Sequence, residues 1–380
     1  MVEVPINPAV LRWAIDQSGL SRTEVSDLVG VSQSDLRNWE KGDASPSLTE
    51  FRRLADVLHR QAAVFFLAAP PSQAGPKANL RHPPNASRTE LNPIERRYLR
   101  EMSRTQKVLA WVLEQMRTAK IAIPEFGTSV SPDVAARNLR NRINVSIETQ
   151  ISWKDSSEAF RRWRDALERM GVFVFLFPMG KESARGMSIW DQRAPAVTLN
   201  TAWSVTARIY TLFHELAHLV SRTDSACVGY VNARPVASNL SIERWCEQFA
   251  AAFLLPKTHL TLYLQKDVRW KGGRSCDLDH AGKVARRYKV SLRAAVLALI
   301  EIGAAQRSLY ASVPSSSDEK SGGGRGRPRT RIEINEDRFG SRTRATLLRA
   351  MREDLITRAD TLTYLDVGEV ATVSDSGTSM

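Results

Sequence analysis

The sequence predicts a mainly α-helical chain with a small β-sheet: an all-α N-terminal module, then an α+β domain, then a helical tail. Three observations support this fold class. Short amphipathic segments with helix-cap residues fill residues 8–68. Three short β-rich segments replace the helical period between residues 172 and 199, and longer apolar helical segments follow them. At 380 residues the chain is also too long for one ordinary hydrophobic core.

The N-terminal module is a predicted bundle of four short helices. Ser21 is the expected N-cap of the second helix, with Glu24 at the capping-box position. Ser32 and Ser47 are the expected N-caps of the third and fourth helices, and Pro70-Pro71 ends the unit. Each helix has apolar residues at helical spacing, so the four can share one small core.

The α+β domain and the helical tail are predicted from where the hydrophobic spacing changes between helical and strand periodicity. The predicted helices are Pro93–Lys120, Asp133–Arg142, Ser156–Met170, Ala202–Val220, Ile242–Phe253, the segment Ala281–Ala305, Arg342–Met351 and Arg358–Leu365. The predicted strands are Val172–Phe177, Gly186–Trp190 and Ala196–Leu199. The expected boundaries are the N-terminal module at 1–70, a Pro-rich linker at 71–90, the α+β domain at 91–308, a disordered Arg/Gly/Ser-rich linker at 309–331 and the tail at 332–380.

Composition indicates a globular cytoplasmic protein. Apolar residues make up 43% and charged residues 25%, and no apolar run approaches the roughly 20 residues of a membrane span. Three cysteines without a CxxC pair argue against a disulfide framework. The net charge of +13 is compatible with nucleic-acid binding. Residues 1–70, however, carry seven Lys/Arg and nine Asp/Glu, so the positive excess lies further along the chain.

The strongest chemical signal is His214-Glu215-Leu216-Ala217-His218 inside an apolar helix. Residues four apart share a helix face, so both imidazoles can bind one metal ion. Glu215 can then contact a water on that ion, whose pKa zinc lowers to about 7. A chance match on a buried helix is the alternative, and it is rare for a chain with six histidines.

A catalytic zinc site needs a third protein ligand and keeps one position for water. Glu243 and Glu247 share a face of the next apolar helix. We favour Glu243 as the ligand and Glu247 as a second carboxylate that orients a ligand histidine. His259 and His280 are alternative third ligands, and two solvated surface carboxylates are the structural alternative.

The sequence around these residues resembles the ImmA/IrrE family of metallopeptidases. The matching segments are Arg208-x-x-x-Leu-Phe-His-Glu-Leu-Ala-His218, Glu243-x-x-Cys-x-x-Phe-Ala-Ala-x-Phe-Leu-x-Pro256, Gly171-Val172 and Arg185-Gly-Met-Ser188. The resemblance covers roughly residues 131–305. It implies a zincin-like fold, Zn²⁺ bound by His214, His218 and Glu243, and Glu215 as catalytic base. It also implies a transcriptional repressor as substrate. Glu247 departs from the pattern, since the family usually has Asn there.

Ser21–Gly42 is similar to the helix-turn-helix of Cro/repressor (XRE) proteins, through its Gly-Val-Ser turn and its Trp-Glu-x-Gly ending. In such folds the third helix enters the major groove of DNA. Carried over, the base and phosphate contacts would come from Gln33, Ser34, Arg37 and Asn38, with Arg22 on phosphate. The net −2 charge of the module disfavours DNA binding through counterion release. Protein docking or dimerisation is therefore the alternative use of the same fold.

Two further patterns are weaker. Val284–Leu297 resembles a second helix-turn-helix, but packing inside the peptidase domain explains it better. Gly324-Arg-Gly-Arg-Pro-Arg329 resembles an AT-hook that would insert Arg325 and Arg327 into the minor groove, and a flexible basic linker is the simpler interpretation.

The function predicted from sequence is that of a zinc-dependent endopeptidase in transcriptional regulation. Its expected partners are a repressor substrate and, through the N-terminal module, DNA. Two alternatives stay open: a DNA-binding regulator whose zinc site is structural or sensory, and a protein that sequesters a partner. The glutamate inside the histidine motif disfavours the first, because a structural zinc site does not need a base at Glu215.

Overall fold

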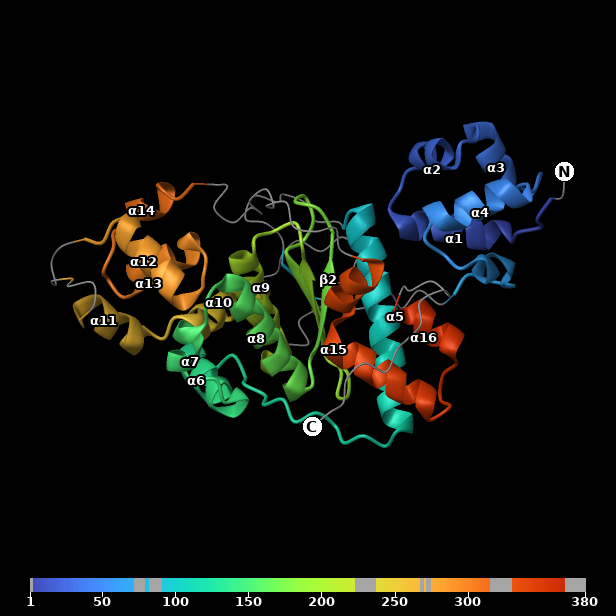
Figure 1. Cartoon of the computed structure of the whole chain (residues 1–380). Coiled ribbons are helices and arrows are strands. Elements are labelled where there is room, and N and C mark those ends of the chain that lie inside the picture. Colours follow the sequence, from blue (N-terminus) through green and yellow to red (C-terminus); the bar gives the residue numbers. More distant parts are fainter. Residues whose placement is uncertain are drawn as a thin grey trace. The chain divides into compact units, whose positions relative to one another are not determined.

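A computed structural model describes residues 3–71, 79–81, 91–222, 237–266, 270, 275–314 and 330–365. The chain divides into two compact units (Figure 1). The first comprises Met1–Pro76 and Ser87–Glu101, and the second comprises Lys77–Ala86 and Met102–Met380. The expected Arg/Gly tract at 324–329 and Cys227 lie outside the described residues.

The first unit contains the expected four-helix bundle. Its elements are α1 (Pro8–Ser18), α2 (Arg22–Val29), α3 (Gln33–Lys41), α4 (Leu48–Val57), the 3-10 helix η1 (Ala62–Phe66) and the first part of α5 (Pro93–Gln115). Capping boxes begin three of the helices, at Ser21, Ser32 and Ser47. The core includes Leu11, Leu36 and Leu54, all at most 1% exposed. The predicted cap residues and apolar periodicity of this module are therefore confirmed.

The second unit is built on a four-stranded sheet with the order β1-β3-β4-β2. Its strands are β1 (Asn79–Arg81), β2 (Phe173–Phe177), β3 (Gly186–Ile189) and β4 (Ala196–Asn200). β2 runs parallel to β4, whereas β3 is antiparallel to both β4 and β1. The three predicted strands are present. The fourth, β1, comes from the segment expected to be a linker, and it pairs with β3 between Asn79 and Ser188.

Helices cover both faces of the sheet. The remaining elements are α6 (Pro132–Ile143), α7 (Ile147–Ser152), α8 (Ser156–Met170), α9 (Val205–Ser221), α10 (Ala237–Leu254), α11 (Lys257–Lys266), α12 (Leu278–Tyr288), α13 (Leu292–Glu301), α14 (Ser308–Ala311), α15 (Arg331–Arg352) and α16 (Arg358–Tyr364). α8 and α9 pack on one face of the sheet, and α15 packs on the other (Figure 1). Among the described residues, no helix combines the length and hydrophobicity of a membrane span.

The alternation of β2 explains this three-layer arrangement. Val174 and Leu176 belong to the main core, which also contains Trp163 and Phe213. Phe175 and Phe177 point the other way, with ring centroids 6.2 and 6.5 Å from that of Phe339 on α15. Because both faces are covered, the strand is apolar throughout instead of alternating with polar residues.

α15 is divided by Gly340, a non-helical residue with φ of 80° and ψ of 164°. The part after Gly340 matches the predicted helix Arg342–Met351, whereas the part before it is an addition to the prediction, and α15 is part of the second unit. Its Ser341 Oγ donates a 2.6 Å hydrogen bond to Glu168 Oε2 on α8. Arg164 Nε donates to Glu168 Oε1 at 3.0 Å, and Arg164 Nη1 donates to the carbonyl oxygen of Asp337 at 2.6 Å. This part of the expected tail therefore covers the sheet.

The segment expected to be helical at Ala281–Ala305 forms two helices. Lys289, with φ of 59°, ends α12 in the left-handed region, and Ser291 caps α13. The apolar residues Val284, Ala295 and Leu299 join the main core. Packing inside the domain thus accounts for the pattern that resembles a second helix-turn-helix.

Candidate metal centre

The histidine motif occupies the middle of α9. Ser204 caps this helix by accepting a hydrogen bond from the Ala207 N–H, and the helix ends at Arg222 in the left-handed region. Every residue from Thr211 to Ser221 is buried. His214 and His218 are 1% and 3% exposed, so their imidazoles lie inside the domain and not at its surface.

α10 packs against α9 and brings Glu243 to the two histidines. Glu243 Oε2 lies 3.2 Å from His214 Nε2, and Glu243 Oε1 lies 3.3 Å from His218 Nε2. The two Nε2 atoms are 3.3 Å apart. In the described part of the chain these are the residues whose donor atoms converge closely enough for a metal ion.

The spacing fits zinc. Ligand atoms 2.0–2.1 Å from a tetrahedral zinc ion are about 3.3 Å from one another. Two imidazole nitrogens and one carboxylate are also a donor set typical of catalytic zinc, which keeps its fourth position for water or substrate. The Glu243 side chain is 45% exposed, so the group of donors is open to solvent on the α10 side.

Glu215 is fully buried beside this group and is held by the sheet. Its Oε2 accepts a 2.8 Å hydrogen bond from Ser188 Oγ on β3. Gly186 lies two residues earlier on the same strand. A Cβ there would be 2.6 Å from Thr211 Cγ2 and 2.9 Å from Glu215 Oε1, so β3 approaches α9 at a distance that only glycine permits.

The pKa values of Glu243 and His218 are shifted by burial and by the charged and polar groups around them. Burial would raise the pKa of Glu243, but the hydrogen bonds to His214 and His218 outweigh it and hold that pKa well below its usual range. Burial would lower the pKa of His218, but Cys246, Glu243 and Glu215 together raise it well above its usual value. The site therefore favours a carboxylate at Glu243, the form that binds a cation.

In the first unit, the predicted DNA contacts lie on and beside α3. Gln33, Ser34, Arg37 and Asn38 are all exposed. Gln33 Nε2 donates to Thr23 Oγ1 at 3.0 Å, and Arg37 Nη2 lies 3.4 Å from Gln33 Oε1. Arg22 is placed differently, because its guanidinium pairs with Glu40 at 2.9 Å and with Asp16 at 3.3 Å. Four of the five side chains thus share one exposed face of α3, whereas Arg22 on α2 is 49% exposed and engaged in ion pairs with Glu40 and Asp16.

Comparison with known proteins gives two matches. Residues 167–299 match the peptidase family model described as the IrrE N-terminal-like domain. The chain carries an IrrE-like peptidase domain. Residues 11–65 match the helix-turn-helix family model, so a helix-turn-helix domain precedes it. No curated protein matches the chain.

The IrrE-like domain places the other candidate ligands away from the metal centre. Glu247 is exposed on α10. His259 Nδ1 lies 2.7 Å from the hydroxyl of Tyr288, and His280 Nδ1 lies 2.6 Å from Asp277 Oδ1 at the start of α12. None of the three joins the group formed by the two motif histidines and Glu243.

Two side chains of the IrrE-like domain had no role predicted from sequence. Ser188 hydrogen-bonds Glu215, and Cys246 Sγ lies 3.5 Å from His218 Nδ1, where second-layer partners of ligand histidines usually sit. Cys246 is three residues beyond Glu243, on the side of α10 that packs against α9, so helical spacing could have indicated it. No local spacing indicates Ser188, because it comes from a separate strand.

Proposed function

We propose that the chain is a zinc-dependent endopeptidase that acts in transcriptional regulation by cleaving a repressor protein. The observation that carries this proposal is the convergence of His214, His218 and Glu243 beside the buried carboxylate of Glu215. The IrrE-like peptidase domain supports the reaction class. The repressor as substrate rests on the resemblance to the ImmA/IrrE family.

In this proposal His214, His218 and Glu243 hold the ion. Zinc, when bound, supplies Lewis acidity that polarises the scissile carbonyl and makes water a better nucleophile. Glu215 accepts the proton of the attacking water and delivers it to the leaving amine. The hydrogen bond from Ser188 fixes the orientation of the Glu215 carboxylate for this proton transfer. Burial of Glu215 shields that transfer from bulk solvent.

The helix-turn-helix domain is the second part of the proposal. The exposed polar face of α3 supports DNA binding, with Gln33 and Arg37 as the side chains best suited to base edges. The ion pairs of Arg22 with Glu40 and Asp16 leave it less suited to phosphate than the sequence suggests. The module would bring the peptidase to a promoter or to a DNA-bound repressor.

A DNA-binding regulator with a structural or sensory zinc site is the second candidate function. The same α3 face supports it, and it requires no proteolysis. Glu215 argues against it, because a buried carboxylate hydrogen-bonded beside the donor group has a use in catalysis and none in a closed structural site.

Co-expression with the helix-turn-helix repressors encoded near this chain tests the proposal. Immunoblots and mass spectrometry should find a repressor cut at one position in cells with the wild-type chain. The same repressor should stay intact with His214→Ala. If every such repressor stays intact beside a wild-type chain that carries zinc, the regulator without proteolysis becomes the better account.

A further inference from the structure

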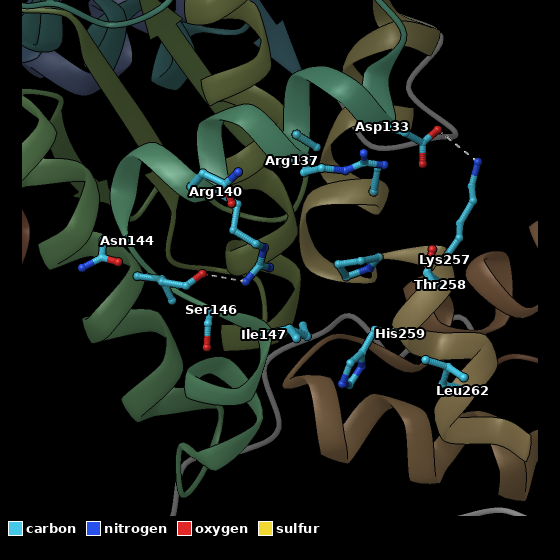
Figure 2. Close-up of a pocket in the computed structure, with 15 residues that line it drawn as sticks. Asp133, Arg137, Arg140, Asn144, Ser146, Ile147, Lys257, Thr258, His259 and Leu262 are labelled. Carbon is cyan, nitrogen blue, oxygen red and sulfur yellow. Dashed lines mark hydrogen bonds and ion pairs between the residues drawn. The ribbon is translucent and has the colours of Figure 1, made fainter. Parts of the chain in front are cut away.

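A second candidate site lies in the second unit. It is a pocket of about 760 Å³ formed by α6, α7, the end of α10 and the start of α11. Figure 2 shows Arg137 and Arg140 on one side of this pocket and Lys257, Thr258 and His259 on another. The volume falls within the range of about 300–1,000 Å³ typical of small-molecule sites. None of the metal-centre residues lines it.

The charges that line the pocket are unbalanced. Its acidic residue, Asp133, pairs with Lys257 at 3.2 Å (Figure 2), and Lys257 also pairs with Glu301 at 2.9 Å. Arg137 and Arg140 have no carboxylate within ion-pair distance among the described residues. Neither guanidinium therefore has a direct ion-pair partner in this part of the chain, although Glu148 acts on Arg140 from a longer distance and raises its pKa.

Arg140 is the more buried of the two arginines. The residue is only 8% exposed, and burial lowers its pKa to about 10. Its terminal nitrogens donate to the Val145 carbonyl at 3.1 Å, to Gln150 Oε1 at 2.6 Å and to the Phe253 carbonyl, while its Nε has no hydrogen-bond partner in the described residues. The guanidinium also lies over the rings of Trp163 and Phe253, with its Cζ 5.3 and 4.7 Å from their centroids. Burial nevertheless lowers the pKa of Arg140 more than Glu148 raises it. An anion in the pocket would therefore stabilise the charge further.

Two further features indicate the kind of anion. The first turn of α11, with Lys257, Thr258 and His259, presents the positive end of a ten-residue helix to the pocket. Ile147 and Leu262 give the pocket an apolar wall (Figure 2). A phosphate group suits the cationic side, and an uncharged ring suits the apolar side.

We propose that this pocket binds a phosphorylated small molecule of mononucleotide size. The phosphate lies among Arg137, Arg140 and the first turn of α11, and the remainder of the molecule packs on Ile147 and Leu262. This site is separate from the metal centre and does not depend on the proposed peptidase activity.

Isothermal titration of the full chain tests the proposal with nucleoside monophosphates, ribose 5-phosphate, inorganic phosphate and adenosine as probes. We expect saturable binding of at least one phosphorylated probe, weaker binding of inorganic phosphate and none of adenosine. Arg137→Gln should weaken the binding of the best probe about tenfold or more, because a charge-assisted hydrogen bond to its phosphate is lost. Arg142→Gln is the matched control, since Arg142 is exposed on the same helix outside the pocket, and it should leave binding unchanged.

Thr258→Glu provides a second variant that should fold normally. An acidic residue in the first turn stabilises a helix, yet here it adds negative charge to the pocket, so binding should be lost while the melting temperature is kept. No binding of any phosphorylated probe at ~10 mM would overturn the proposal. Adenosine or inorganic phosphate binding as tightly as the best probe would overturn it too, as would equal effects of Arg137→Gln and Arg142→Gln.

Discussion

Two carboxylates one turn apart on α10 have different surroundings. Glu243 lies within 3.3 Å of both motif imidazoles, whereas Glu247 is exposed and outside the convergent donor group. Zinc binding requires a deprotonated donor at about 2.0–2.2 Å, so only the first carboxylate is placed to be a ligand.

The first prediction concerns metal content. Purified wild-type chain should carry about one zinc per molecule by plasma mass spectrometry, and His214→Ala or His218→Ala should lose it, because two remaining ligands hold zinc poorly. Glu243→Ala should also lose most of the metal. Glu247→Ala is the matched control and should keep it. Loss of zinc in Glu247→Ala but not in Glu243→Ala would reverse the ligand assignment.

Ser188 allows a test of how Glu215 is positioned. Ser188→Ala removes the hydrogen bond to Glu215 Oε2 without touching a metal ligand. Zinc content and KM should stay near wild type while kcat falls about tenfold, because a misplaced base lowers the rate of proton transfer. Thr198→Val is the control: its buried Oγ1 has no hydrogen-bond partner in the described residues, so replacing it should not lower kcat. Equal losses in the two variants would mean that only packing was disturbed.

The sequence predicts some of these side chains and not others, for a physical reason. His214, Glu215 and His218 lie within one helix, where the period fixes which side chains share a face. Glu243 lies on a second helix, and sequence spacing alone leaves Glu247, His259 and His280 as alternatives, because the packing of α10 on α9 decides which carboxylate reaches the histidines. Ser188 acts across the contact between β3 and α9, and no local period encodes such a tertiary contact.

The contact between β3 and α9 depends on a glycine. Thr211 and Glu215 of α9 lie so close to Gly186 that an added Cβ would have to displace them. The strand, the helix and the Glu215 carboxylate are therefore positioned together.

We predict opposite effects for two glycine-to-alanine changes. Gly186→Ala should destabilise the peptidase unit by about 1–3 kcal/mol through overpacking, and it should lower activity because Glu215 is displaced. Gly282 lies inside α12, where the nearest side-chain atom would be 3.5 Å from a new Cβ. Gly282→Ala should instead stabilise by about 0.5–1 kcal/mol. Urea unfolding of the two variants measures whether each free energy of unfolding falls or rises. An unchanged free energy of unfolding in Gly186→Ala would contradict the close approach of β3 to α9.

Segments with a clear period were predicted at the level of helices and strands, and segments that depend on distant partners were not. β2 was predicted because both of its faces are buried and it is apolar throughout. The three residues of β1 carry no strand pattern of their own and form a strand by pairing with β3. The part of α15 before Gly340 is not predicted from sequence because its packing on the sheet comes from Phe339, whose partners lie far away in sequence.

Across the whole chain, DNA binding by the helix-turn-helix domain and proteolysis by the IrrE-like domain should be separable by mutation. Gln33→Ala with Arg37→Ala should weaken binding to a specific promoter fragment about 10–100-fold in mobility shifts, because base contacts are lost. Proteolysis should remain. Arg52→Ala with Gln61→Ala removes the same groups from exposed positions outside α3 and should leave DNA binding intact. Binding that survives the α3 variant but disappears on deletion of Arg325–Arg331 would move the DNA contact to the basic segment.

The central claim is that Glu215 is the base of a zinc peptidase. Its most direct test compares Glu215→Gln with wild type for both zinc content and cleavage of the target repressor. Glu215→Gln leaves His214, His218 and Glu243 in place, so zinc should stay bound, while loss of the general base should lower the cleavage rate about 10²–10⁴-fold. Glu247→Gln, the same change on an exposed carboxylate, should cleave normally. If Glu215→Gln cleaves the repressor and switches on the repressed genes as well as wild type, Glu215 is not the base and the account is wrong.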